Sequence, residues 1–141
     1  MSDVEGLRTF VLVLDKGDEA FEQISGFARE HDITGAGLTA VGAGNAVTLG
    51  YFDPEIMDYR ATEFTEQLEL LSMVGDVATK DGEPAVHAHI VLGRKDSTTI
   101  GGHLKRFVVW PTLEVVLTET PSTLRKKLDP ETGLALIDLG S

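Results

Sequence analysis

Apolar and polar residues alternate along much of this chain, which is the pattern of half-buried β-strands. The clearest case is residues 86–92, where the even positions are apolar while the odd positions carry His87, His89 and a valine. Residues two apart in a strand project to the same face, so this segment predicts a strand with one face turned toward a core. Apolar runs at residues 8–15 and 68–74 are also typical of strands.

One segment, residues 18–31, has helical periodicity instead. Its apolar residues recur at the spacing of a single helix face: Phe21, Ile24, Phe27 and Ala28. Asp18 precedes them as the predicted N-cap, with Glu19 in the first turn. His31 falls in the last turn, where a positive charge suits the helix dipole, so we assign it a structural role.

The stretch after this helix, residues 35–53, is rich in glycine among small and β-branched residues. Gly42, Gly44 and Asn45 form a G-x-G-N pattern that is similar to part of a phosphate-binding loop. Such a loop needs a strand before it and a helix after it, whereas the residues that follow here are typical of another strand. We therefore interpret these glycines as β-bulges or a hairpin.

Turns divide the rest of the chain into further short strands. Asp81 and Gly82 stand in favoured hairpin-turn positions, residues 94–97 form the next turn, and a Pro-Glu-Thr-Gly turn lies at residues 130–133. Many short strands and one main helix predict an α+β fold with a mostly antiparallel, strongly curved sheet. A length of 141 residues fits one domain, so we expect residues 1–141 to form a single domain.

Charge argues against a nucleic-acid partner. The chain has 12 Lys and Arg against 23 Asp and Glu, a formal net charge of -11. A phosphate polyanion is repelled by such a field unless basic residues gather on one surface. The basic clusters, at residues 94–95, 105–106 and 125–127, are each flanked by acidic or apolar residues. Solvated faces and turns explain them more simply.

The start of the chain is acidic where a signal peptide would be positively charged. Its apolar run, residues 10–14, is far too short to cross a membrane. We therefore expect a cytoplasmic protein with no membrane partner. The chain contains no cysteine, which excludes disulfides and thiolate ligands, so any metal must be held by nitrogen or oxygen.

Three of the four histidines lie close together in the sequence. In a strand, His87 and His89 would share one face and lie about 7 Å apart along it. His103 joins them if the segments on either side of residues 94–97 form a hairpin with an odd-numbered loop. An even-numbered loop would turn His103 to the other face, unless a bulge at residues 101–102 corrected it.

Two odd-numbered registers are open for that hairpin. With Gly93 opposite Ser97, His103 would lie across from His87, and with Gly93 opposite Thr99 it would lie across from His89. Three neutral imidazoles from two paired strands are a suitable ligand set for Zn²⁺ or another divalent metal. They leave one position open for water or a carboxylate, as in catalytic sites. The alternative is that these histidines satisfy backbone or carboxylate partners at a subunit interface.

Two carboxylates in neighbouring predicted strands are further candidates for this site. Glu69 interrupts the apolar run Leu-Glu-Leu-Leu-Ser-Met, and Glu114 lies in Leu-Glu-Val-Val. Either could be a fourth ligand, a partner of a ligating histidine, or a general acid or base, and Glu69 is the candidate catalytic residue. An ordinary outward-facing strand carboxylate explains Glu69 equally well.

Over nearly its whole length the chain resembles the PPC domain (plants and prokaryotes conserved). The resemblance lies in the H-x-H of His87 and His89, the G-G-H-L at residues 101–104, and flanking segments at residues 40–53 and 129–139. It implies one helix packed on a curved, mostly antiparallel sheet, assembled as a homotrimer. Prokaryotic members are generally described as candidate DNA-binding proteins.

The resemblance also implies roles for particular residues. The same structural superfamily includes acetolactate decarboxylase, whose zinc is held by histidines in a similar arrangement. Carried over, His87, His89 and His103 become the metal ligands, while Glu69 and Glu114 match glutamates of the family. The chain has no Arg-Gly-Arg-Pro core of the AT-hook, which in plant members supplies the minor-groove contact.

Two classes of function therefore remain open. The first is a metal-dependent enzyme or small-ligand binder, in which a trimeric scaffold holds Zn²⁺ and a small molecule. The second is a regulatory module linked to DNA or transcription, in which the histidine site is structural.

Overall fold

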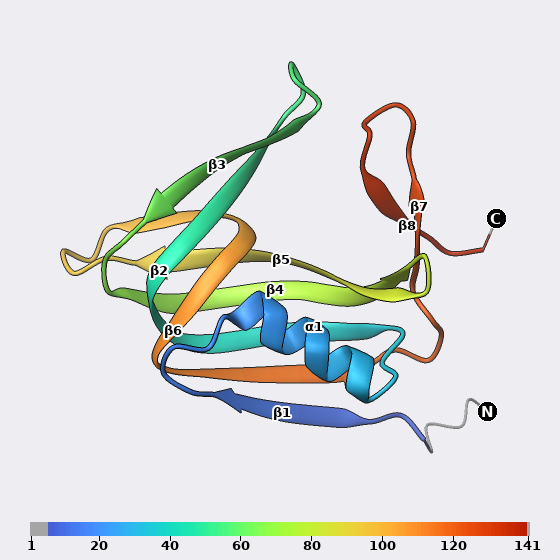
Figure 1. The fold of residues 1–141 in the computed structure, drawn as a ribbon, viewed down its shortest axis with the longest axis horizontal. Helices are drawn as coiled ribbons and strands as arrows, with labels where there is room; N and C mark the ends of the chain where they lie inside the picture. Colours follow the sequence, from blue (N-terminus) through green and yellow to red (C-terminus); the bar gives the residue numbers. More distant parts are fainter. Residues whose placement is uncertain (1–5, 141) are drawn as a thin grey trace.

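Eight strands of one β-sheet and a single helix make up the fold of residues 6–140, the part of the chain that the computed structural model describes (Figure 1). The elements are β1 (Thr9–Leu14), α1 (Ala20–Glu30), β2 (Ala36–Asp53), β3 (Asp58–Phe64), β4 (Leu68–Lys80), β5 (Glu83–Gly93), β6 (Thr99–Glu119), β7 (Arg125–Leu128) and β8 (Ala135–Asp138). This confirms the predicted α+β class with one main helix.

Strand pairing explains the curvature of the sheet. Its order is β3-β2-β6-β5-β4-β7-β8, with β1 on the far side of β6 and a further pairing of β2 with β4. Because β2 pairs with both β4 and β6, the strands β2, β6, β5 and β4 close into a ring. All pairings are antiparallel except the single bridge between β4 and β7. The sheet is therefore mostly antiparallel, as predicted.

Helix α1 begins one residue later than the sequence predicted. Its N-cap is Glu19, and the prediction of Asp18 was wrong. The Glu19 carboxylate accepts from the backbone N–H groups of Phe21 and Glu22, and from Phe107 N–H of β6 at 2.8 Å. Asp18 instead accepts from Asp15 N–H and closes the preceding turn. The longer glutamate side chain caps the helix and ties it to the sheet in one step.

The glycine-rich segment forms the long strand β2 and its bulges, as predicted. The register against β6 shifts on both sides of Gly44. A Cβ at Gly44 would lie 2.6 Å from the Val108 carbonyl oxygen, so the close approach of β2 to β6 requires glycine there. No helix follows, which excludes the phosphate-loop geometry.

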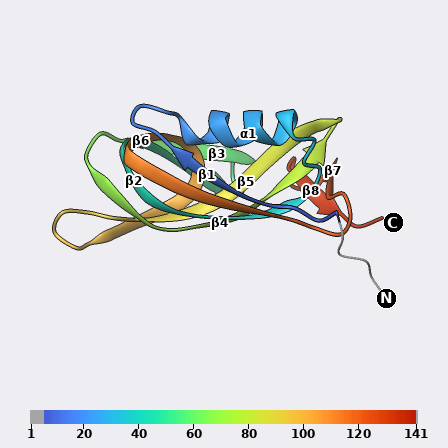
Figure 2. The ribbon, with the colours of Figure 1, turned by 90° about the horizontal axis from the view of Figure 1, so that it is seen from below.

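Helix α1 covers one face of the curved sheet, and the core lies between them (Figure 2). The largest buried side chains come from the helix and from the inward faces of the strands: Ile24, Leu38, Met73, Ile90, Leu92, Leu104, Phe107 and Leu117. The even positions of β5 from Val86 to Leu92 are all buried, as the alternation predicted, so the odd positions between them point away from the helix.

Replacing Phe107 by alanine should destabilise the protein by about 3–5 kcal/mol, because this ring is fully buried and its loss leaves a cavity. Thermal unfolding followed by circular dichroism measures the effect. Leu139→Ala is the control, since Leu139 is 83% exposed and its loss should change stability by less than about 0.5 kcal/mol. Equal melting temperatures for the two variants would contradict the assignment of Phe107 to the core.

No helix within residues 6–140 is long and apolar enough to cross a membrane. Asp3 and Glu5, two of the acidic residues on which the signal-peptide prediction rests, lie in residues 1–5, outside the described part of the chain.

Candidate metal centre

The hairpin of β5 and β6 positions the three clustered histidines. Gly93 lies opposite Thr99 and His89 lies opposite His103, which is one of the two odd-numbered registers predicted from the sequence. His87 lies two residues before His89 on the same face of β5, away from the helix. The structure therefore brings together the three histidines that the sequence selected.

The three rings face one another closely. Ring centroids are 5.1 Å apart for His87 and His89, 5.2 Å for His87 and His103, and 5.6 Å for His89 and His103. Each ring contributes one nitrogen to a set of three, and these three nitrogens all lie within 4.8 Å of one another. Zn–N bonds of about 2.0–2.1 Å allow two ligand nitrogens to lie up to about 4 Å apart. A modest rotation of the rings therefore suffices to bring all three onto one ion.

Burial keeps the clustered imidazoles in the form that binds metal. Burial, followed by the neighbouring charges of His87 and His89, lowers the pKa of His103 to about 4. Burial is also the largest cause that lowers the pKa of His87, with the Lys126 ammonium next. Both rings are therefore neutral at pH 7, with a lone pair available to a cation.

Two polar atoms around the cluster lack partners. Within the described residues, two buried side-chain atoms form no hydrogen bond. They are Nδ1 of His103 and the carboxylate oxygen Oδ1 of Asp76. Buried polar atoms in proteins are normally satisfied, so unpaired ones here call for a ligand or an ion. Together with the three clustered imidazoles, this makes the donor set suitable for a divalent metal.

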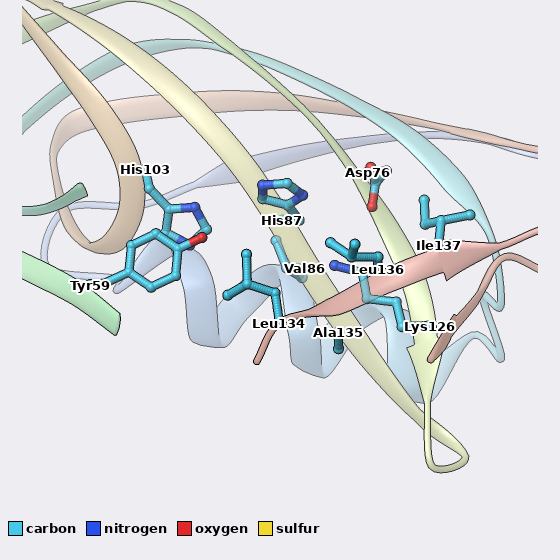
Figure 3. Close-up of a pocket in the computed structure, with 10 residues that line it drawn as sticks. All are labelled: Tyr59, Asp76, Val86, His87, His103, Lys126, Leu134, Ala135, Leu136 and Ile137. Atoms are coloured by element: carbon cyan, nitrogen blue, oxygen red, sulfur yellow. The ribbon is translucent and has the colours of Figure 1, made fainter. Parts of the chain in front are cut away.

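Residues that sequence reasoning missed complete the surroundings. Tyr59 on β3 packs its ring against His103, with centroids 4.5 Å apart. Asp76 on β4 lies directly opposite His87. Lys126 on β7 points toward the same space (Figure 3). The acidic residue at position 76, between Gly75 and Val77, was a usable signal for Asp76, but nothing local marks Lys126.

These residues surround a cavity of about 470 Å³ beside the histidines (Figure 3). Its floor is the outward face of β4 and β5, and its opposite wall is the hairpin of β7 and β8. The lining residues are Tyr59, Asp76, Val86, His87, His103, Lys126, Leu134, Ala135, Leu136 and Ile137. The volume lies within the range of small-molecule sites.

The two candidate glutamates lie elsewhere in the chain. Glu69 is exposed and pairs with Gly93, four residues along β5 from His89, which is about 13 Å at the rise of a strand. Glu114 lies opposite Val13 on the half of β6 that pairs with β1. Neither glutamate joins the histidines within one chain, so any role for them in the site remains a prediction.

Comparison with known proteins gives relatives of the same fold. No curated protein matches the chain. Among solved structures, the metal-containing protein AF0104 from Archaeoglobus fulgidus is 36% identical with a TM-score of 0.86, over 92% of each chain. A candidate DNA-binding protein from Bacteroides thetaiotaomicron is 22% identical with a TM-score of 0.90, over 96% of this chain and 98% of that one. At that identity the second likeness shows the fold alone.

A more distant neighbour shares the fold. A Staphylococcus aureus protein of unknown function, similar to α-acetolactate decarboxylase, has a TM-score of 0.55 at 13% identity. The match spans 80% of this chain and 52% of that one, and it too shows the fold alone. The family model for the Plants and Prokaryotes Conserved (PCC) domain matches residues 1–121. The chain therefore belongs to this plants-and-prokaryotes-conserved family, as its H-x-H and G-G-H-L motifs predicted.

Proposed function

We propose that this protein binds a divalent metal ion through His87, His89 and His103, and that it binds a small molecule in the adjoining cavity. The observation that carries the proposal is the convergence of three imidazole nitrogens within 4.8 Å of one another. Zinc suits such a set of imidazole nitrogens. The metal-containing relative from Archaeoglobus fulgidus, at 36% identity, supports the metal-binding part of this proposal.

The residues divide the work of such a site between them. The three histidines hold the ion, and the cavity wall orients a molecule beside it. When bound, the metal would polarise an oxygen atom of that molecule as a Lewis acid. Tyr59 covers one side of His103 and restricts the position of its ring.

The distribution of basic side chains favours this function over DNA binding. Arg8, Arg29, Arg60 and Arg94 each form an ion pair with a carboxylate. Lys126 faces the cavity. The net charge of -11 adds a repulsive field. Retarded migration of a DNA duplex at moderate salt would be needed to support the alternative.

We also propose that three copies of the chain assemble into a homotrimer through the outward face of the sheet. Four valines on this face are between 54% and 68% exposed: Val11, Val13, Val41 and Val74. Strand register places Val13 and Val41 on either side of Glu114, and it places Val74 next to His89. Contiguous exposed apolar side chains of this kind are typical of protein interfaces.

Zinc binding should be near one ion per chain at pH 7.5 and should be lost as the pH falls toward 4. Protons compete with the metal for each imidazole. Because the pKa of His87 is lowered and that of His103 is about 4, the competition at these two rings begins below the ordinary value of 6.5. Equilibrium dialysis of chelator-treated protein at several pH values, with metal analysis, measures it. Failure to take up zinc at pH 7.5 would overturn the proposed function.

A further inference from the structure

We propose that the cavity beneath the β7–β8 hairpin binds a small organic acid, whose carboxylate is held by Lys126 and whose hydroxyl group donates to Asp76. The inference rests on the proposed function, because His87 and His103 line the same cavity. It extends that function by naming the class of ligand and the residues that recognise it.

Lys126 has the position of a ligand-binding cation. Alternation along β7 turns Lys126 into the cavity and leaves it half-buried, whereas Arg125 and Lys127 on either side are exposed. Its ammonium lies close enough to the clustered rings to lower the pKa of both His87 and His103. Among residues 6–140 it belongs to none of the ion pairs. Its charge is therefore available to an anion in the cavity (Figure 3).

Asp76 supplies an acceptor in the same cavity. It lies across β4 and β5 from His87, and its Oδ1 is buried without a hydrogen-bond partner in the described part of the chain. An unpaired buried carboxylate oxygen is costly, and a donor on a bound molecule would satisfy it. A hydroxyl group next to the ligand's carboxylate fits this need.

The charged side chains of the lining set the class of acid. They are Lys126 and Asp76. Lys126 can hold one carboxylate, whereas a second anionic group placed beside Asp76 would be repelled by its carboxylate. The lining therefore favours a carboxylic acid that presents a neutral donor to Asp76.

The roof of the cavity favours a short apolar chain on the ligand. Leu134, Leu136 and Ile137 form it, and the last two are 46% and 40% exposed as they stand. A bound aliphatic group would cover them. The hairpin follows the last residue of the family match, residue 121, so this roof is not part of what defines the family. The β7–β8 hairpin is attached to β4 by a hydrogen bond in which the Thr79 N–H donates to the Leu124 carbonyl oxygen at 2.6 Å.

The test compares three small ligands on the zinc-loaded protein: lactate, propanoate and the neutral propanamide. Titrations followed by amide chemical shifts should show that lactate binds most tightly and propanamide most weakly. Lys126→Met should weaken lactate binding on the order of tenfold or more, because it removes the charge but keeps the aliphatic stem. Asp76→Asn should reduce the advantage of lactate over propanoate. Lys127→Met, on the exposed side of the same strand, is the matched control and should bind lactate as the unsubstituted protein does.

Zinc content, measured first for every variant, separates the two proposals. If the unsubstituted protein takes up no zinc, the proposed function fails and this inference fails with it. If zinc is taken up but lactate binds Lys126→Met and Lys127→Met equally, or binds neither the variants nor the unsubstituted protein at millimolar concentration, the inference alone is overturned. Lys126→Gln gives a second test should the methionine variant unfold.

Discussion

Replacing His89 by alanine is expected to weaken zinc binding by about 100-fold or more, since loss of a residue that merely supports a ligand already costs about 10–100-fold. His89 is exposed, and its side chain faces away from the helix and the core, so its removal should leave the fold intact. Isothermal titration of chelator-treated protein with zinc measures the affinity, and circular dichroism verifies the fold.

His31→Asn is the matched control for this experiment. His31 lies at the C-cap of α1, where its ring stacks on Phe27 with centroids 3.9 Å apart, and it contacts none of the clustered rings. The control variant should bind zinc as the unsubstituted protein does. Undiminished zinc binding by His89→Ala would show that the ion, if bound, is held elsewhere in the chain.

The hairpin that carries the histidines could be predicted because its determinants are local. Alternation assigned His87 and His89 to one face of β5, and two odd-numbered registers were among those that would bring His103 to the same face. The structure has the second of these, with His89 opposite His103. Sequence could not choose between them, because the choice depends on how the whole turn closes. Ser97 has a positive φ of 70° in that turn. This conformation is uncommon for serine, so the residue type does not predict it.

The parts of the site that sequence missed are those brought together over long distances in the chain. Lys126 reaches the cavity because the chain returns to β4 after β6 ends. There, a single parallel bridge pairs Arg125 of β7 with Thr79 of β4. No periodicity in the basic segment distinguishes Lys126 from Lys127, and only the pairing with β8 decides which of them faces inward. The wrong N-cap has a similar origin, because Glu19 also accepts from Phe107 N–H across the core.

The outward face of the sheet connects the metal centre with the proposed trimer interface. Strand register places side chains from four strands in one row: Val11 on β1, Val116 on β6, Thr39 on β2 and Val74 on β4. The next residue in this row is His89 on β5. A subunit packed against the row would therefore end near the exposed edge of the histidine cluster. The outward face of the sheet, which no other described part of the single chain covers along this row, also carries His89, the most exposed of the three histidines.

Introducing lysine at both Val11 and Val13 is expected to dissociate the trimer into monomers. These valines are each 68% exposed on β1, at a distance from the cavity, so the single chain should tolerate the change. In a trimer the substitutions would bury six additional positive charges, and unpaired charges in an interface cost several kcal/mol each. Sedimentation velocity should give about three times the chain mass of 15.2 kDa for the unsubstituted protein and the chain mass itself for the double variant.

Leu139→Lys provides the matched control, because Leu139 is 83% exposed near the end of the chain and away from the row of valines. This variant should sediment as the unsubstituted protein does. A monomeric unsubstituted protein, or a double variant that remains trimeric, would contradict the proposed interface. Neither result would bear on the metal ligands, because all three histidines come from one β-hairpin of a single chain. Zinc titration of the dissociated double variant would then show how much of the affinity depends on subunits that cover His89.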